Sequence, residues 1–383
     1  MGFTSPMYKR FLLPVGMLAG AIIGAGVFAL PYVLQPFGVL GAALYLGALG
    51  AVFALVHLLY ADLVLRAPDN LNFVGIARHY LGSFGFVLTL LTGVFQMFFV
   101  LLIYLVLSES FFALLGSALA APGLVAFWLL GSAAVFLSAR RFAAVEFLIT
   151  LLLVLIMVFV FALGFRSGSV VLLQPTAPFP WGLAMLAIAP VLFSLAGRVA
   201  VAEVVAYFNR AREAAPHIIR AVVWGTLLPA ALYFLFVLAV WALSPEVTHD
   251  AVTGLRETVS PNTLALLGVL GLLSLWSSYI IVGLNVKNIL RDDLRFPPLA
   301  AGALVVFMPL ALYGAGFTNF LQLVEFTGGT FLAIEGALLI FLWQRANRES
   351  DPVLLRRVPG ILLLPLYAIF LLALIGVAVG GII

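Results

Sequence analysis

The chain has 383 residues, of which 65% are hydrophobic and only 9% are charged, and its mean hydropathy is +1.24. A water-soluble fold cannot bury so much apolar surface, so the composition predicts an integral membrane protein. There is no cysteine, which excludes disulfides, thiolate chemistry and cysteine–metal sites, and the four histidines lack the spacing of metal ligands.

Apolar runs of about 20 residues, long enough to cross a bilayer, alternate with short polar breaks along the chain. Each run is too long and too apolar for the alternating strands of a β-barrel, so the sequence predicts an all-α bundle of transmembrane helices. Eleven spans are expected, at residues 11–35, 39–65, 84–114, 122–138, 144–165, 182–206, 217–243, 262–290, 297–315, 319–344 and 358–382. Residues 66–82 and 208–221 are expected to form amphipathic elbows, and 244–262 a loop with a short surface helix.

The basic residues predict how the chain is oriented. The N-terminal "MGFTSPMYKR" leads into an apolar segment without a small-residue cleavage motif, so we expect a retained first span. With the N-terminus in the cytoplasm, sixteen Lys and Arg residues fall on the cytoplasmic side, Arg166 and Arg256 fall outside, and Arg198 lies within a span. This asymmetry favours eleven spans in a plasma membrane, with the C-terminus outside.

The first span contains residues that destabilise a helix. Its segment "GAIIGAGVFALPY", residues 20–32, holds Gly20, Gly24, Gly26 and Pro31. In a helix interior glycine costs about 1 kcal/mol and proline about 3 kcal/mol relative to alanine. One explanation is close helix packing. The other is an unwound segment at mid-depth.

The sixth span, "GLAMLAIAPVLFSLAGRVAVAEVVAYF", repeats this feature with Pro190, Gly197, Arg198 and Glu203 at membrane depth. Interrupted spans at corresponding positions of two halves indicate a transporter binding site. Since spans 1 and 6 are five apart, they predict a five-plus-five inverted repeat. Unwound backbone persists in a membrane only where protein, water, substrate or ions satisfy it. Freed amides suit an anion and freed carbonyls a cation, so the two breaks suit a zwitterion such as an α-amino acid.

Three segments resemble those of the amino acid/polyamine/organocation transporter superfamily, which has the LeuT-type fold. "AGAIIGAGVFALPY" is similar to its helix-1 motif, and "SLWSSYIIVGLNVKNILRDDL", residues 274–294, to helix 8. "APVLFSLAGRVAVAEVV", residues 189–205, resembles helix 6, where Gly197 and Glu203 match but Ala196, Arg198 and Ala202 depart. The resemblance is strongest to aromatic and hydroxy amino acid permeases and related eukaryotic amino acid transporters. It implies one domain over 1–383, with repeats 11–165 and 182–344 and an extra helix at 358–382.

The resemblance implies a substrate site at mid-depth between helices 1, 3, 6 and 8. Backbone at Ala25, Gly26 and Val27 would meet the substrate carboxylate. The carbonyls of Ile22 and Phe193, with Ser194, would meet its ammonium group. Ala196, Gly197, Gln96 and Tyr104 would shape the side-chain pocket. Phe193 is either a gating aromatic or an ordinary packed one.

A coupling ion is expected if transport is uphill. Ser274, Ser277 and Ser278 share one helical face, and their oxygens suit a hard cation. Sodium-coupled relatives of LeuT type imply that the carbonyls of Gly20 and Ile23 complete such a site. Alternatively, the hydroxyls bond back to their own helix. Sodium coupling, proton coupling and passive exchange all stay open.

Charged residues within membranes are functional suspects. Glu203 is the best candidate for a proton carrier, with Arg198 as its partner, and the alternative is a static pair that closes the cytoplasmic path. Asp62 and Glu146 lie near cytoplasmic span ends, where solvation at the interface accounts for them. His57 is interpreted as a packed residue.

The predicted function is secondary active transport of an amino acid, aromatic or otherwise large and neutral, by ion-coupled symport and alternating access. An exchanger or uniporter of the same fold is the alternative. A channel would need a continuous polar stripe or rings of charge, and an enzyme a catalytic constellation, which the sequence lacks. A metal-ion transporter of this fold would show Asp-Pro-Gly and Met-Pro-His, which are absent.

We expect no cofactor beyond Na⁺ or H⁺, and no nucleic acid partner. The expected partners are the substrate and the lipid bilayer; the oligomeric state is open, and a monomer would suffice.

Overall fold

A computed structural model describes residues 7–68, 71–136, 143–166, 180–211, 214–244, 246–355 and 359–380, and these form helices joined by short connections. The α-helices are α1 (Leu13–Ile22), α2 (Leu30–Leu34), α3 (Gly38–Arg66), α4 (Phe73–Leu115), α5 (Ala120–Val135), α6 (Ala143–Arg166), α7 (Trp181–Leu195), α8 (Arg198–Ala211), α9 (Ala215–Leu243), α10 (Pro261–Asn288), α11 (Pro298–Gly314), α12 (Phe320–Phe326), α13 (Ala333–Ala346) and α14 (Leu364–Val379). Short 3-10 or π turns are η1 (Tyr8–Leu12), η2 (Ala25–Ala29), η3 (Gln35–Phe37), η4 (Ser117–Leu119), η6 (Thr253–Glu257), η7 (Ile289–Asp293), η8 (Thr327–Leu332) and η9 (Gly360–Leu363).

These helices overlie all eleven predicted spans. The first span is α1, η2 and α2, the sixth is α7 and α8, and the tenth is α12, η8 and α13, while each other span is one helix. Seven of the described helical stretches are long and apolar enough to cross a membrane, and α11 and α14 are shorter apolar helices. The chain is therefore an all-α, multi-pass membrane protein. The division into two inverted repeats stays a prediction.

Two connections differ in detail from expectation. The predicted elbow at 66–82 is helical from Phe73, and it is set off from the rest of α4 by Gly82, whose φ of +65° is a conformation that favours glycine. The predicted elbow at 208–221 is not a separate helix in the described residues, because α8 continues to Ala211 and α9 begins at Ala215. The expected short helix in the 244–262 loop is η6.

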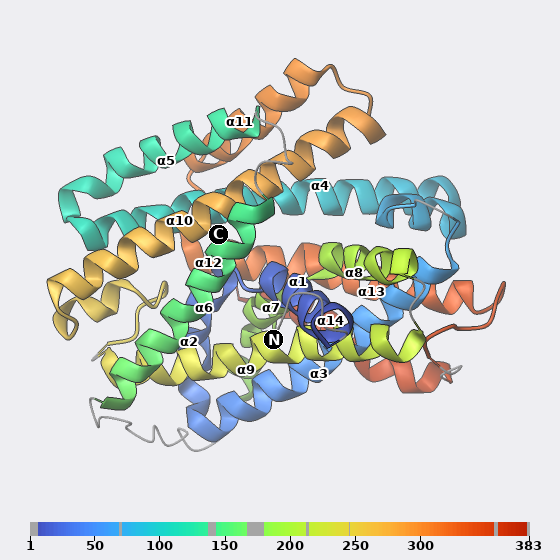
Figure 1. Cartoon of the computed structure of the whole chain (residues 1–383), viewed down its shortest axis with the longest axis horizontal. Coiled ribbons are helices and arrows are strands. Elements are labelled where there is room, and N and C mark those ends of the chain that lie inside the picture. The colour runs from blue at the N-terminus through green and yellow to red at the C-terminus, as the bar shows by residue number, and fades with distance from the viewer. Residues whose placement is uncertain are drawn as a thin grey trace.

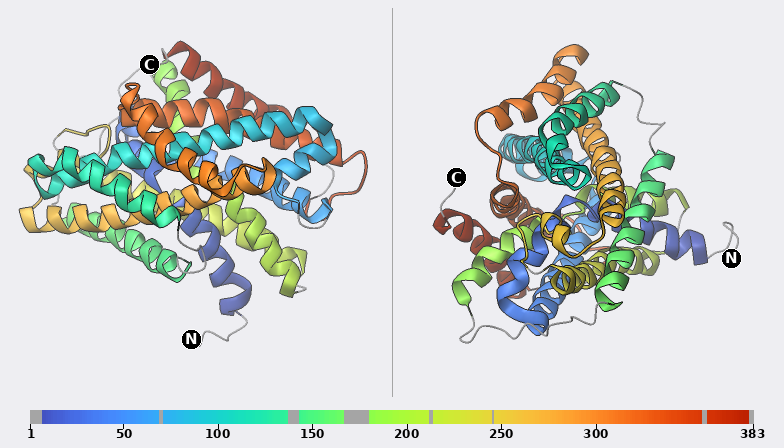
Figure 2. Two further views of the ribbon diagram at one scale, coloured as in Figure 1. Left: turned by 90° about the horizontal axis from the view of Figure 1, so that it is seen from above. Right: turned by 90° about the vertical axis from the view of Figure 1, so that its left-hand side faces the viewer.

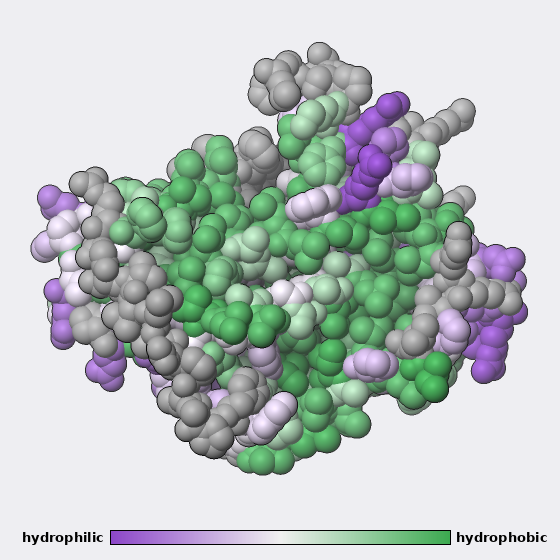
Figure 3. All heavy atoms as spheres, turned by 90° about the horizontal axis from the view of Figure 1, so that it is seen from below, coloured by the Kyte–Doolittle hydropathy of each residue, from purple (hydrophilic) through white to green (hydrophobic). Residues whose placement is uncertain are grey.

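The helices run mostly along the long axis of the molecule (Figure 1), and several are seen nearly end-on in the right-hand view of Figure 2. One group joins α4 with α5, α10 and α11, and in another α9 packs against α1, α3 and α6. Of the broken helices, α1 belongs to the second group, while α7 packs against α14 and α8 against α3. The face shown in Figure 3 is largely apolar, with hydrophilic residues at its left and right ends and in a group that projects at its top. This band suits the hydrocarbon layer of a bilayer.

The helix ends that carry Lys9, Arg66, Arg210 and Arg345 define what we call the basic end of the bundle. Contacts tie these ends together. Arg66 donates to the Asn347 side chain at 2.8 Å, and the Tyr207 hydroxyl donates to the Lys9 carbonyl at 3.0 Å. These contacts join the four basic helix ends in two pairs, α3 with α13 and α8 with η1, and the orientation of the chain stays a prediction.

Asp62 is not solvated, so the interpretation of this carboxylate as an interfacial group is wrong. It is completely buried at the basic end of α3. Its oxygens accept hydrogen bonds from the Trp343 indole at 2.8 Å and from the amides of Val353 and Leu354 at 2.7 Å, and Arg66 lies 2.8 Å away. The carboxylate therefore fastens α3 to α13 and to the chain that follows α13. The side chain of Glu146 lies outside the described part.

Replacement of Asp62 should loosen this end of the bundle. Asp62→Ala removes four partners at once and leaves the Arg66 charge buried, and breaking a buried ion pair costs about 3–5 kcal/mol. We expect a lower melting temperature in detergent, measured by thermal unfolding. Glu349→Gln, an exposed acidic residue at the same end, is the control. Equal melting temperatures for the two variants would contradict the role of Asp62 in holding α3 to α13.

Candidate functional site

The first span is broken at the predicted position. α1 ends at Ile22, and the chain then extends through Ile23, with ψ of 104°, and Gly24. Helix resumes at Ala25 and continues through η2 and α2 to Leu34, and Pro31 is the second residue of α2. The amides at Ala25 and Gly26 therefore stand at the start of a helix, where donors lack intrahelical partners.

The sixth span is broken opposite the first. α7 ends at Leu195, Ala196 is extended with ψ of 122°, and α8 starts at Arg198. Pro190 lies inside α7, and the Ser194 hydroxyl donates to its carbonyl at 2.7 Å. Both predicted interruptions are thus breaks in the backbone.

The two breaks touch each other, and glycine is required at both contacts. A Cβ atom at Gly26 would lie 2.6 Å from the Cα atom of Ser194. A Cβ atom at Gly197 would lie 2.4 Å from the Ile22 side chain. Gly24 is different, since a Cβ atom there would lie 3.6 Å from the Tyr104 hydroxyl and 3.9 Å from the Ile22 carbonyl oxygen, which are ordinary contacts. Close approach therefore explains Gly26 and Gly197.

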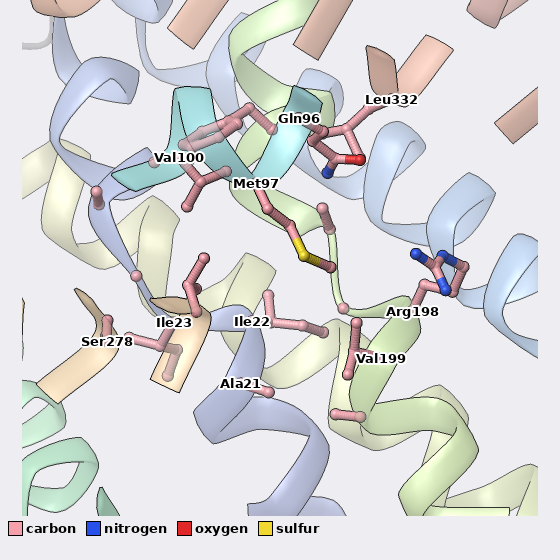
Figure 4. Close-up of a pocket in the computed structure, with 18 of the residues that line it drawn as sticks. Ala21, Ile22, Ile23, Gln96, Met97, Val100, Arg198, Val199, Ser278 and Leu332 are labelled. Atoms are coloured by element: carbon pink, nitrogen blue, oxygen red, sulfur yellow. The ribbon is translucent and has the colours of Figure 1, made fainter. Parts of the chain in front are cut away.

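A cavity of about 310 Å³ lies beside the breaks, which is the size of a small-molecule site. Figure 4 shows Gln96, Met97 and Val100 of α4 across this cavity from Ile22 and Ile23 of the first break. Fifteen of the seventeen predicted site residues line it. They are Gly20, Ile22, Ile23, Ala25, Gly26, Gln96, Tyr104, Phe193, Ala196, Gly197, Arg198, Glu203, Ser274, Ser277 and Ser278.

The two other predicted residues, Val27 and Ser194, lie outside the lining. Val27 is fully buried and its amide bonds the Gly24 carbonyl at 3.4 Å. The Ser194 hydroxyl is used by the Pro190 carbonyl. The carbonyl of Ile22, predicted to meet an ammonium group, already accepts from the Tyr233 hydroxyl at 2.8 Å. A carbonyl has a second lone pair, so this bond leaves it able to accept once more.

The three predicted α10 serines share the cavity wall with the first break. Ser274 and Ser277 are buried, and Ser278 lies beside the Tyr104 hydroxyl. Among the hydrogen bonds of the described residues, Ser194, Thr226 and Thr327 donate to a carbonyl of their own helix, whereas the α10 serines do not. The oxygens of Ser274 and Ser277 are therefore available to a ligand, while Ser278 has the Tyr104 hydroxyl as a partner.

Arg198 pairs with Glu335 of α13, so the predicted pairing with Glu203 is wrong. The Arg198 Nε and Nη2 atoms lie 2.5 and 3.2 Å from the two Glu335 oxygens. The guanidinium also lies over the rings of Phe73, 4.2 Å from the centroid, and Tyr60, at 5.8 Å. The Glu335 carboxylate balances the charge of the guanidinium, and the two rings stabilise it further. The pair therefore makes the cavity wall polar without adding a net charge.

The sequence analysis missed several residues that line the cavity. Glu335 and Asn285 are the polar ones, and Met97, Val100 and Phe370 are among the apolar ones. Glu335 had a signal, because it is an acidic residue within a predicted span. His57 also lines the cavity, and its Nδ1 atom lies 2.9 Å from the Thr226 hydroxyl, which fits its interpretation as a packed residue.

The cavity extends toward the basic end. From the breaks it reaches Glu203 along α8 and Asn285 along α10, in the direction of the helix ends that carry Arg210 and Lys287. On the opposite side Phe28 packs edge-on against Phe111 and Phe236, with ring centroids 5.2 and 5.7 Å apart. A separate cavity of about 670 Å³ lies beyond this aromatic cluster, under the 246–256 loop. It contacts neither break.

The contact between the breaks predicts a sharp difference between two glycines of the first span. Gly26→Ala should lower the melting temperature and shrink the cavity, because its Cβ atom would overlap backbone of α7. Gly16→Ala in α1 is the matched control, since nothing lies within 4 Å of a Cβ atom there. Thermal unfolding of both variants in one detergent measures the difference. A Gly26→Ala protein as stable as the control would refute the contact.

Solved structures of transporters share this fold. The chain aligns with MhsT in complex with L-phenylalanine with a TM-score of 0.66 and 14% identity, over 98% of both chains. It aligns with the inward-facing form of Mhp1, a nucleobase-cation-symport-1 family transporter, with a TM-score of 0.61 and 18% identity, over 97% of this chain and 89% of that one. It aligns with a manganese transporter of Eremococcus coleocola with a TM-score of 0.62 and 13% identity, over 99% of this chain and 87% of that one. At these identities the likeness shows the fold, which is of LeuT type.

Sequence comparison is more specific. No curated protein gives a significant match. Residues 7–379, which include both broken helices and every residue of the cavity, match a known family. The chain belongs to the tryptophan/tyrosine permease family.

Proposed function

We propose that this permease carries one aromatic amino acid, tryptophan or tyrosine, in the 310 Å³ cavity, together with a coupling cation. The observation that carries the proposal is the pair of helix breaks facing one apolar cavity in a member of this family. Amides at Ala25 and Gly26 would receive the carboxylate, and carbonyls at the ends of α1 and α7 the ammonium group.

The substrate ring would lie between α4 and α8. Met97 and Val100 offer an apolar wall there, and Gln96 offers an amide that can donate or accept a hydrogen bond. An indole N–H or a phenol O–H could use the amide. An aromatic substrate with one polar atom matches such a wall. A charged substrate side chain would find no unpaired opposite charge there, because Arg198 and Glu335 neutralise each other.

The coupling cation is assigned to Ser274, Ser277 and Ser278 with the carbonyls of Gly20 and Ile23. The hydroxyls of Ser274 and Ser277, which do not bond their own helix, support this assignment, because oxygen ligands suit a hard cation. Sodium is the cation proposed for this site. Proton coupling through Glu203, which lines the cavity toward the basic end, is the second candidate.

The basic end is proposed to face the cytoplasm, which places the N-terminus inside and the C-terminus outside. The cavity would then extend toward the cytoplasm, and the packed rings of Phe28, Phe111 and Phe236 would close the path to the outside. Alternating access would require these rings to separate when the cavity opens outward.

Uptake into proteoliposomes tests the proposal. Labelled tryptophan, tyrosine and leucine are supplied under an inward sodium gradient and, separately, an inward proton gradient. We expect sodium-driven uptake of the two aromatic amino acids that falls at least about tenfold in Ser277→Ala, because a coupling site loses a ligand. Ser108→Ala is the control, since Ser108 is buried in α4 but bonds its own helix.

Two results would contradict parts of this account. Proton-driven uptake that survives Ser277→Ala but fails in Glu203→Gln would move the coupling to α8. A folded protein that takes up no aromatic amino acid under either gradient would refute the substrate assignment.

A further inference from the structure

α9 carries side-chain donors to the backbone of both broken helices. Tyr233 is completely buried, and its hydroxyl donates to the Ile22 carbonyl at 2.8 Å and lies 3.1 Å from the Ser194 carbonyl. These carbonyls belong to the last turns of α1 and α7, where oxygens have no amide partner within the helix. One side chain therefore serves the ends of both half-helices.

The hydroxyl has a single proton, so it donates to one of the two carbonyls at a time. A buried carbonyl without a hydrogen-bond donor costs free energy. The fold is therefore more stable when the Ile22 and Ser194 carbonyls both stay within reach of the Tyr233 hydroxyl. The geometry holds the end of α1 and the end of α7 at a fixed separation. That separation is the one at which Gly26 meets Ser194 and Gly197 meets Ile22.

A second bond from α9 holds the other half of the first span. The Trp241 indole, eight residues after Tyr233, donates to the Pro31 carbonyl of α2 at 2.8 Å. α9 thus contacts the first span on both sides of its break. The break lies between two fixed points on one neighbouring helix.

We propose that Tyr233 is a positioning residue for substrate binding. It does not line the cavity, and it acts through the carbonyls that it holds. By fixing the ends of α1 and α7 it places the amides of Ala25 and Gly26 at the cavity wall. The effect of Tyr233 on substrate affinity rests on the proposed function. Its effect on the two breaks does not depend on any substrate.

The test compares Tyr233→Phe with Tyr279→Phe. Tyr279 of α10 is equally buried, and its hydroxyl lies beside Ser132 of α5, away from both breaks. Amide hydrogen exchange is measured on peptides that cover residues 18–30 and 190–202, and tryptophan binding is measured on the same samples. In Tyr233→Phe we expect exchange at both breaks to accelerate, and the dissociation constant to rise, by about tenfold. Tyr279→Phe should change neither.

Exchange at the breaks that stays at the wild-type rate in Tyr233→Phe would overturn the proposal. So would acceleration that also appears in Tyr279→Phe, or that spreads through α4 and α5, because it would mark general destabilisation. Faster exchange at the breaks with unchanged affinity would reduce Tyr233 to an anchor and overturn its positioning role. If the wild-type protein binds no aromatic amino acid, the proposed function fails, while the exchange rates still decide whether Tyr233 holds the breaks.

Discussion

The close contact between the two broken helices is the constraint on which the rest of the site depends. Gly26 lies against the backbone of Ser194, and Gly197 lies against Ile22, so each break is shaped by the other. Broken helices leave polar backbone groups that lipid cannot satisfy. Here Tyr233 partners two of these carbonyls, while the amides at Ala25 and Gly26 begin a helix beside the cavity. In the proposed function the backbone therefore binds the charged groups of the substrate, and the side chains around its ring mainly provide shape.

Charges near this site are compensated by contacts with other helices. Glu335 and two aromatic rings surround the Arg198 guanidinium, and Asp62 is fully hydrogen-bonded where α3 meets α13. Both clusters join α13 to helices of the other side of the cavity, α8 and α3. Buried polar groups of this kind fix a particular arrangement of helices, because breaking them leaves a charge unpaired. Among the predicted site residues, Glu203 is the acidic one, and it lines the cavity without belonging to either cluster.

The fold and much of the site were predictable because their signals are local. Gly26, Pro31, Pro190 and Gly197 mark the breaks within short stretches, and the length of the apolar runs marks the spans. The partner of Arg198 was not predictable, since Glu335 is 137 positions away and only the packing of α13 against the cavity brings it near.

Other features required the packed structure for the same reason. Tyr233 is one tyrosine among many aromatic residues in apolar spans, and no local pattern connects it with the breaks. The π turn η8 was also missed. Its Gly328 lies where a Cβ atom would be 2.0 Å from the Ala189 carbonyl, a contact between spans 6 and 10 that spacing along the chain does not reveal.

The central claim is that the cavity between the breaks is the substrate site. A crystal structure with 5-bromotryptophan tests it most directly, because anomalous scattering locates the bromine. The account predicts a peak inside the 310 Å³ cavity, near Met97 and Val100, with the carboxylate at Ala25 and Gly26. A peak only in the 670 Å³ cavity under the 246–256 loop would contradict it.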